Sequence, residues 1–167
     1  MGVRRQHVLP AVTGCGLSAL GLLMLVISFF LPPLYVVSCV DSCAQPKLYA
    51  TAWVFSQTLL ANLPSSPVIN AFILVLSYLP LLAAVIVVAC LLGFLVRPHR
   101  AFARWGHRAW LTGCIALVLF LLVVLFLASF FSGGPELGFW GLLFGYGLLW
   151  AGNRVALART ERVIPET

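Results

Sequence analysis

Two long apolar runs, residues 68–96 and 109–131, stand on either side of a stretch that contains four arginines. Each run is long enough to cross a hydrocarbon layer of ~30 Å, which takes a helix of roughly 20 residues. Inside a bilayer there is no water for backbone N–H and C=O groups, so a single segment can cross only as a helix. The two runs therefore predict an all-α integral membrane protein.

Two further apolar runs, residues 10–31 and 137–153, bring the expected number of spans to four. The first contains Cys15 after Val12-Thr13-Gly14, which is similar to a lipoprotein cleavage box, but the charge-free stretch continues beyond it and predicts a retained helix. The chain is 62% hydrophobic and 8% charged, whereas soluble domains are about 45–50% apolar and about 25% charged. We therefore expect residues 1–167 to form a single membrane domain, a four-helix bundle.

The arginines predict how this bundle is oriented. All nine fall in the segments that four spans would place on one side, and they are Arg4, Arg5, Arg97, Arg100, Arg104, Arg108, Arg154, Arg159 and Arg162. Lys47, Asp41 and Glu136 fall on the other side. Cytoplasmic loops of membrane proteins are enriched in Lys and Arg, so both termini, the loop 97–108 and the tail 154–167 are expected in the cytoplasm. The excess of Arg over Lys is typical of GC-rich bacteria and suggests the bacterial cytoplasmic membrane.

The net charge of +6 is thus interpreted as a membrane signal rather than a nucleic-acid signal. The loop arginines recur at three- and four-residue steps with an aromatic residue between them, which indicates a short surface helix leading into the third span. One interpretation is a surface for anionic lipid headgroups or a partner protein; the other is an orientation signal with solvated charges. The residues concerned are Arg97, Arg100, Arg104, Arg108 and Trp105.

Residues 32–67 form the one sizeable external loop, after Pro32 and Pro33 end the first span. Residues 35–37 and 48–54 are β-branched and aromatic runs that favour a hairpin. The alternative is an interfacial helix over residues 52–63 that lays Trp53, Phe55, Leu59 and Leu60 on the headgroups. We favour a hairpin followed by a helical turn, with Ser66 and Pro67 opening the second span.

Small residues mark two of the spans as surfaces for close helix packing. They are Gly14, Ser18 and Gly21 in the first span and Gly138, Gly141 and Gly145 in the fourth. The alternative is that glycine is simply frequent in membrane helices. The short turn at residues 132–136 predicts that the third and fourth spans are antiparallel neighbours. Pro80, in the middle of the second span, predicts a kink that serves either a gate or helix packing, with Ser77 placed to bond a freed carbonyl.

No Asp, Glu, His, Lys or Arg lies within the four spans, so the sequence offers no proton relay, ion path or haem ligand there. We expect no catalytic residues, no metal and no cofactor, and we leave bound lipid or pigment open. Cys15, Cys90 and Cys114 lie at a similar expected depth and are interpreted either as buried hydrophobic residues or as a three-thiolate site.

Cys39 and Cys43 lie in the external loop, where a disulfide can persist, and form a structural bridge, two free thiols or a redox pair. On topology and these cysteines the chain resembles the quinone-linked disulfide-forming oxidoreductases of bacterial inner membranes. The resemblance implies a thiol oxidoreductase that uses Cys39 and Cys43. The spacing here is Cys-x-x-x-Cys where that family has Cys-x-x-Cys, and residues 132–136 lack the family's second cysteine pair.

These observations give three hypotheses for the function. The first is a non-catalytic accessory or structural subunit that docks on a larger membrane protein complex or on copies of itself. The second is a membrane thiol-disulfide oxidoreductase, and the third is a small oligomeric channel or transporter built around the Pro80 kink.

Overall fold

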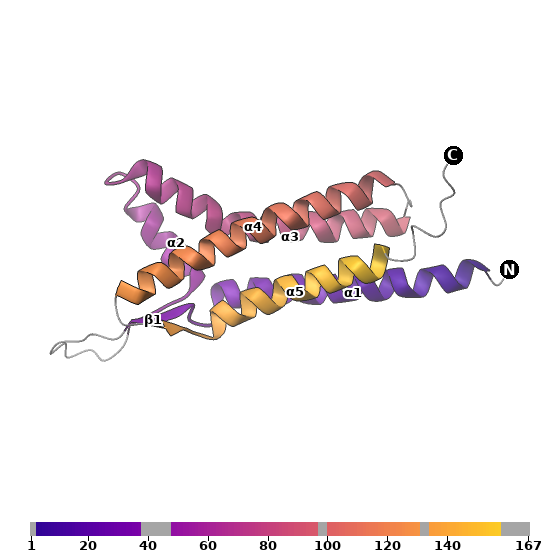
Figure 1. Ribbon diagram of the computed structural model, residues 1–167, viewed down its shortest axis with the longest axis horizontal. Helices are drawn as coiled ribbons and strands as arrows, with labels where there is room; N and C mark the ends of the chain where they lie inside the picture. Colours follow the sequence, from indigo (N-terminus) through magenta and orange to yellow (C-terminus); the bar gives the residue numbers. More distant parts are fainter. Residues whose placement is uncertain (1–2, 38–47, 97–99, 131–133, 158–167) are drawn as a thin grey trace.

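The computed structural model describes residues 3–37, 48–96, 100–130 and 134–157 and is dominated by helices, as predicted (Figure 1). The helices are α1 (Val3–Phe30), α2 (Ala52–Ala61), α3 (Pro67–Val96), α4 (Arg100–Phe130) and α5 (Leu137–Leu157), and the strands are β1 (Tyr35–Val37), β2 (Leu48–Ala50) and β3 (Gly134–Pro135). Among the described residues, three helical segments are long and apolar enough to cross a membrane: Val12–Phe30, Pro67–Val96 and Ala101–Leu127. The chain is therefore an all-helical protein with three clear candidate spans.

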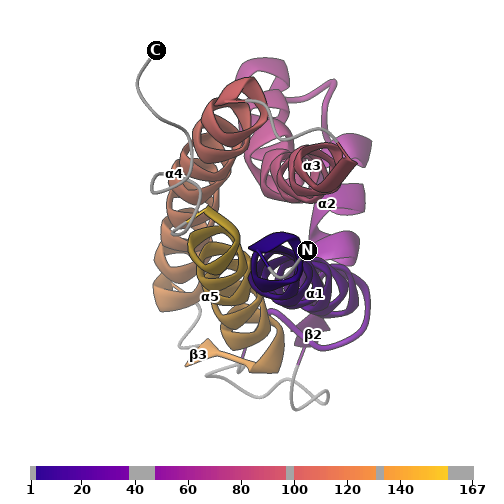
Figure 2. The same cartoon turned by 90° about the vertical axis from the view of Figure 1, so that its right-hand side faces the viewer.

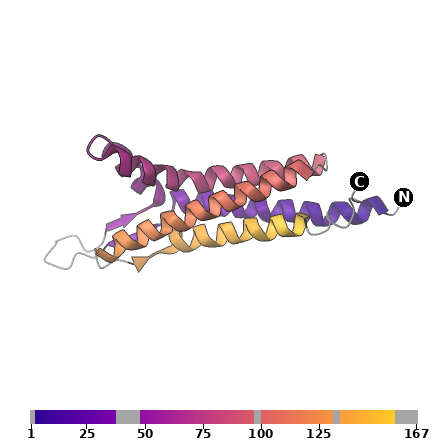
Figure 3. The ribbon, with the colours of Figure 1, turned by 45° about the horizontal axis from the view of Figure 1, so that its top comes forward.

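The four long helices run along the long axis of the molecule as two pairs (Figures 1 and 2). Helix α1 packs on α5 and helix α3 packs on α4, and contacts within each pair are far more extensive than contacts between the pairs. The predicted antiparallel contact between the third and fourth apolar runs is therefore only a minor one, because α5 packs mainly on α1. The start of α1, the end of α3, the start of α4 and the end of α5 all lie at the same end of the bundle (Figure 3).

Proline fixes two helix boundaries close to the predicted positions. Helix α1 ends at Phe30, just before Pro32 and Pro33. Helix α3 begins at Pro67, where a missing N–H is harmless because the first turn has no carbonyl to receive it. The backbone of Asn70 bonds the carbonyl of Ser66 at 3.1 Å. Helix α4, in contrast, is continuous from Arg100, so the predicted short surface helix is the first part of α4 itself.

Residues 32–67, predicted to be external and called the external region below, contain in their described part both structures that the sequence offered as alternatives, the hairpin and the helix. Strands β1 and β2 pair antiparallel, with Val37 opposite Leu48, and α2 follows directly. The third strand was not predicted: Gly134–Pro135 pairs antiparallel with β1 and gives the sheet order β2-β1-β3. The backbone N–H of Glu136 also donates to the carbonyl of Leu34 at 3.1 Å. The sheet therefore ties the start of α5 to the end of α1.

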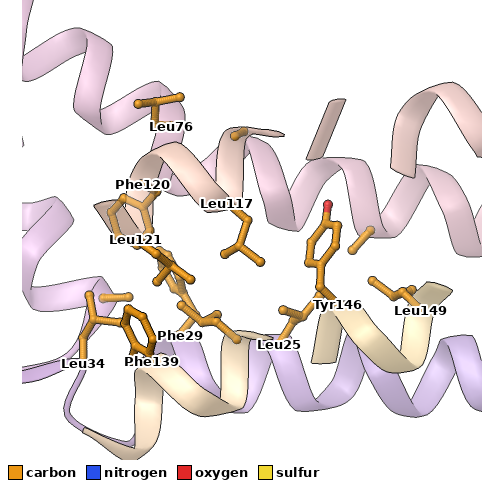
Figure 4. Packing of buried hydrophobic residues seen from close by; sticks show 14 of the residues in the cluster. Leu25, Phe29, Leu34, Leu76, Leu117, Phe120, Leu121, Phe139, Tyr146 and Leu149 are labelled. Atoms are coloured by element: carbon orange, nitrogen blue, oxygen red, sulfur yellow. The ribbon is translucent and has the colours of Figure 1, made fainter. Parts of the chain in front are cut away.

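The core is a continuous cluster of apolar side chains contributed by all five helices (Figure 4). Its largest fully buried members are Phe29, Phe120, Leu25, Leu34 and Leu149. Figure 4 shows Tyr146 extending from α5 toward α3 and α4, so that its ring fills the space between the two helix pairs. Packing of this kind is what holds helices together in lipid, where burial of apolar surface between helices gives little net gain.

Candidate functional site

The small residues of α1 and α5 face one another and form a seam in which the two backbones touch. A Cβ added to Gly14 would lie 2.6 Å from the carbonyl oxygen of Gly152, and one added to Gly21 would lie 2.7 Å from that of Gly145. Carbon atoms do not approach backbone oxygen so closely, so only glycine fits at these positions. We call this α1–α5 contact the glycine seam.

The structure places the other predicted packing residues at or beside this seam. Ser18 is fully buried and lies against Gly152, while Gly141 lies against Ser28. Gly138 instead faces the carbonyl of Pro33, where an added Cβ would lie 2.8 Å from the oxygen. Gly152 was missed from the sequence, although it follows Gly145 by two helical turns and that spacing could have revealed it.

Two side-chain polar atoms are buried without a hydrogen-bond partner in the described part of the chain. They are the Ser18 hydroxyl, in the glycine seam, and the indole N–H of Trp110, near the arginine end of α4. The ring of Trp110 stacks on that of His107 with centroids 6.2 Å apart. The seam thus uses Ser18 for its small volume and not for a hydrogen bond.

The described arginines lie in the first turns of α1, in the first part of α4 and near the end of α5, and these helix ends share one end of the bundle, which we call the arginine end (Figure 3). Arg108 lies over the ring of Trp105, with its guanidinium carbon 5.9 Å from the ring centroid. A second pair, not predicted, lies on α5: Arg154 is 5.7 Å from the ring centroid of Trp150. Of the other predicted residues, Arg104 is exposed on α4, Arg97 lies outside the described residues, and only the backbone of Arg100 is described.

Helix α2 is held firmly against the rest of the external region. The Thr51 hydroxyl accepts from the backbone N–H of Val54 at 3.1 Å and caps the helix. The Ser56 hydroxyl lies 2.8 Å from its own helix's Ala52 carbonyl and 3.1 Å from the hydroxyl of Ser77 on α3. These bonds fix one face of α2 against α3.

The apolar side chains of α2 are divided between its two faces. Phe55 points inward and packs against Phe120 of α4, with ring centroids 6.1 Å apart. Trp53, Val54 and Leu60 point outward and are 38%, 49% and 50% exposed. Of the four residues predicted to lie on the headgroups, Phe55 is therefore in the core, Leu59 is half-buried, and Trp53 and Leu60 remain available for an outside contact.

Pro80 is buried inside the bundle, and its carbonyl accepts a hydrogen bond of 3.1 Å from the Tyr146 hydroxyl. Ser77 does not take the role predicted for it, because proline at position 80 frees the carbonyl of Leu76 and the Ser77 hydroxyl donates to Leu74. Contacts from α5 thus hold the region around Pro80 in the core. They favour the packing interpretation of the kink over the gate.

The cysteines do not form a recognisable centre within the described chain. Cys15, Cys90 and Cys114 are free and partly buried, and no three His, Cys, Asp or Glu side chains there come close enough to hold a metal ion. Cys39 and Cys43 lie outside the described residues. They fall in the segment that connects Val37 to Leu48, whose backbones are paired in the sheet.

An open groove lies between α3 and α4 in the half of the bundle nearest α2. It has a volume of about 590 Å³ and is lined by Phe72, Leu76, Leu119, Leu122, Val123, Leu125 and Phe126. Figures 1 and 2 show the cause: α3 and α4 lie close together at the arginine end and diverge toward the external end. We call this feature the α3–α4 groove.

Comparisons with known proteins add no relative to these observations. No protein-family model matches the chain, and no curated protein and no solved structure matches it either.

Proposed function

We propose that this chain is a non-catalytic accessory or structural subunit of a larger membrane protein complex, with four spans and both ends in the cytoplasm. The observation that carries the proposal is the outward face of α2, where Trp53, Val54 and Leu60 are exposed on a helix that is fixed in place. Large exposed apolar side chains grouped on one element are typical of a surface that binds another protein or the membrane, and the crosslinking experiment below distinguishes the two.

The fourth span is part of the proposal, because α5 is not among the three described segments that are long and apolar enough to cross a membrane. With 21 residues it extends ~32 Å at 1.5 Å per residue, which matches the hydrocarbon thickness. Its polar residues, Asn153 and Arg154, lie near its end, and several of its glycines lie in the glycine seam against α1. A helix whose backbone touches that of a spanning helix over most of its length is expected to cross the membrane with it.

The four apolar runs, residues 10–31, 68–96, 109–131 and 137–153, contain no Asp, Glu, His, Lys or Arg, which fits a structural role. Their interior is filled instead by apolar side chains and by the glycine seam. At the arginine end we include anionic lipid headgroups among the partners, held by Arg104, Arg108 and Arg154. The two Arg–Trp pairs place guanidinium groups beside indole rings, and both groups favour the headgroup region.

The experiment is photo-crosslinking in the native membrane, with a photoreactive amino acid at Val54 on the outward face of α2. A matched control carries it at Leu20, which is similarly exposed but lies on α1 within a candidate span. We expect a discrete protein adduct from position 54 and lipid adducts from position 20. Isolation in mild detergent should recover the same protein with the chain. Recovery only as a lone monomer, without a protein adduct at position 54, would contradict the proposal.

A thiol oxidoreductase is the alternative that one observation favours: Cys39 and Cys43 lie in the segment joining two paired strands at the external end. If the pair is redox-active, replacing both cysteines by serine should abolish oxidation of added dithiols by membranes that contain the chain. If the pair is a structural bridge or two free thiols, as the accessory-subunit proposal implies, the rate should not change. Cysteine labelling before and after reduction then separates the bridge from the free thiols.

A further inference from the structure

Helix α1 extends further than the helix that packs against it. It begins at Val3, whereas the described part of α5 ends at Leu157. At this end of the glycine seam, the Cβ of Ala156 lies 2.8 Å from a Cβ added to Gly14. Figures 1 and 3 show the first turns of α1 projecting past the described ends of the other long helices. We call residues 3–11, which precede the candidate span Val12–Phe30, the α1 arm.

The glycine seam has a constant register, and this register predicts what lies beside the arm. Gly21 faces Leu149 and Gly14 faces Ala156, so seven residues back along α1 correspond to seven residues forward along α5. Because seven residues make nearly two whole turns of an α-helix, the same sides of the two helices face each other after each step. One further step places position 163 opposite His7 in the same geometry.

The sequence that follows α5 is suited to continue the helix over this distance. Residues 158–164 read Ala-Arg-Thr-Glu-Arg-Val-Ile, in which alanine, arginine and glutamate are good helix formers. Pro165 then favours the end of a helix, because the residue before a proline disfavours the α region. In the register of the seam, this proline lies level with the first turn of α1, which begins at Val3. The helical part of the sequence therefore matches the arm in length.

The charges of the two segments also allow them to associate. The arm contains Arg4 and Arg5, whereas residues 158–167 contain two arginines and two glutamates and are neutral as a whole. In the seam register, position 161, a glutamate, lies about one turn from the level of Arg5. An extended α5 also brings its C-terminal end, which carries a partial negative charge, beside the arginines at the start of α1.

We propose that residues 158–164 continue α5 along the α1 arm, so that the arm is covered by a segment of this chain. The observation that carries the proposal is the seam register, because it belongs to an interface that is already formed between the same two helices. The α1–α5 contact then extends about two turns beyond the candidate span of α1, and the arm is not a surface for another protein. This inference uses only the α1–α5 contact and goes beyond the accessory-subunit proposal.

The experiment is disulfide formation between two introduced cysteines in the full chain, in its membrane, with the five native cysteines replaced by serine. His7→Cys is combined with Val163→Cys, because the register places this pair as Gly14 and Ala156 are placed, well within the Cβ separation of about 3.5–4.5 Å that a disulfide needs. The matched control combines His7→Cys with Arg162→Cys, whose position is adjacent in sequence but faces another side of the helix. After mild oxidation, mass spectrometry of proteolytic fragments identifies the bonds. We expect the 7–163 bond to form at least about tenfold faster than the 7–162 bond, since neighbouring helix positions do not share a face.

A second pair of variants tests whether the segment must be helical. Thr160→Pro interrupts the helix, so it should lower the rate of the 7–163 bond to that of the 7–162 bond. Thr160→Ala is the matched control and should leave the rate unchanged, because alanine favours the helix.

Four outcomes would overturn the inference. Equal rates for the two cysteine pairs would mean that residues 158–167 meet the arm by random collision, and an unchanged rate in Thr160→Pro would mean that no helix is required. A disulfide between two chains would mean that another copy covers the arm, and the absence of any disulfide would mean that the segment lies elsewhere. None of these results depends on crosslinking from Val54 of α2, so failure here and failure of the accessory-subunit proposal can be told apart.

Discussion

The two helix pairs of this protein are held together in different ways. In the α1–α5 pair the backbones touch, because glycine occupies the points of closest approach. In the α3–α4 pair large Leu, Val and Phe side chains keep the helices apart at the external end, where they leave a groove of about 590 Å³. Burial of apolar surface between helices contributes little free energy in lipid. The closeness of packing therefore decides how strongly the two helices of each pair associate. We conclude that α1–α5 is the closely packed pair and α3–α4 the more loosely packed one.

Small residues also occur between α3 and α4, toward the arginine end and near the middle of the bundle, where a Cβ on Gly113 would lie 2.5 Å from the Cβ of Ala83. A Cβ on Gly93 would lie 2.9 Å from the ring of Phe102, and one on Gly106 would lie 3.4 Å from the Cβ of Cys90. The nearest atoms here belong to side chains, and the Phe102 ring can turn away, whereas the nearest neighbours of Gly14 and Gly21 include backbone atoms, which cannot. The same residue type therefore has different consequences in the two pairs.

The largest expected effect comes from filling the glycine seam. Gly21→Leu would place carbon atoms against the backbone of Gly145 and Leu149 and force α1 and α5 apart. We expect a loss of about 3 kcal/mol or more in the free energy of unfolding, measured by denaturant titration in detergent. Gly16→Leu is the control, because nothing lies within 4 Å of a Cβ at that position. Equal losses from the two variants would show that the seam does not hold the helices together.

The next effect is on the link between the two pairs. Tyr146→Phe removes the hydrogen bond to the carbonyl of Pro80 and should lower the free energy of unfolding by about 0.5–1.5 kcal/mol. The measurement is the same titration, with Tyr78→Phe as the control because its ring packs on Phe29 in the same core. If Tyr146→Phe unfolds like the parent, the two pairs are joined by apolar packing alone.

A pair of serine variants compares a serine that serves the glycine seam by its small volume, Ser18, with one that forms a hydrogen bond between α2 and α3, Ser56. Ser18→Ala removes a buried hydroxyl that has no partner and improves helix propensity, so stability should rise by up to about 1 kcal/mol. Ser56→Ala breaks the bond to Ser77 and should lower stability by a similar amount. Thermal unfolding of the two variants and the parent shows whether each substitution raises or lowers stability. Destabilisation by Ser18→Ala would indicate that its hydroxyl does bond in the membrane.

The smallest effect is expected at the sheet that ties the end of α1 to the start of α5. Burial raises the pKa of Tyr35 above its usual value of about 10, so the folded state favours the neutral phenol. This stabilisation is present below pH ~10 and is lost as the pH rises through the folded-state pKa. Between pH 8 and pH 11, the parent should therefore lose stability more steeply than Tyr35→Phe. Identical slopes of stability against pH for the two proteins would contradict the conclusion that burial raises the pKa of Tyr35.

Much of the fold follows from the sequence because it depends on local rules. Apolar length predicts the long helices, and Pro67 marks the start of α3 at the expected residue. The strands β1 and β2 and the helix α2 also occur where β-branched residues and aromatic patterning predicted them. Each of these features is decided by residues adjacent in the chain.

The features that were missed depend on which distant segments meet. Nothing in Gly134–Pro135 indicates a strand, since β3 exists only because α5 packs on α1 and brings it beside β1. The same contact explains why Gly152 belongs to the seam and why α5 has only minor contact with α4. The division of α2 into an inner face at Phe55 and an outer face at Trp53 likewise requires knowing where α4 lies.

The orientation of the four long helices is the central claim of this account, and α5 is its most sensitive part. Single cysteines at Arg104, at Ser65 and at each end of the chain, in a background without native cysteine, can be labelled in intact cells with a membrane-impermeant maleimide. We predict labelling at position 65 only, with the other three sites reacting after the membrane is opened. Labelling of the C-terminal site in intact cells, with the N-terminal site still protected, would mean that α5 does not cross and would contradict the account.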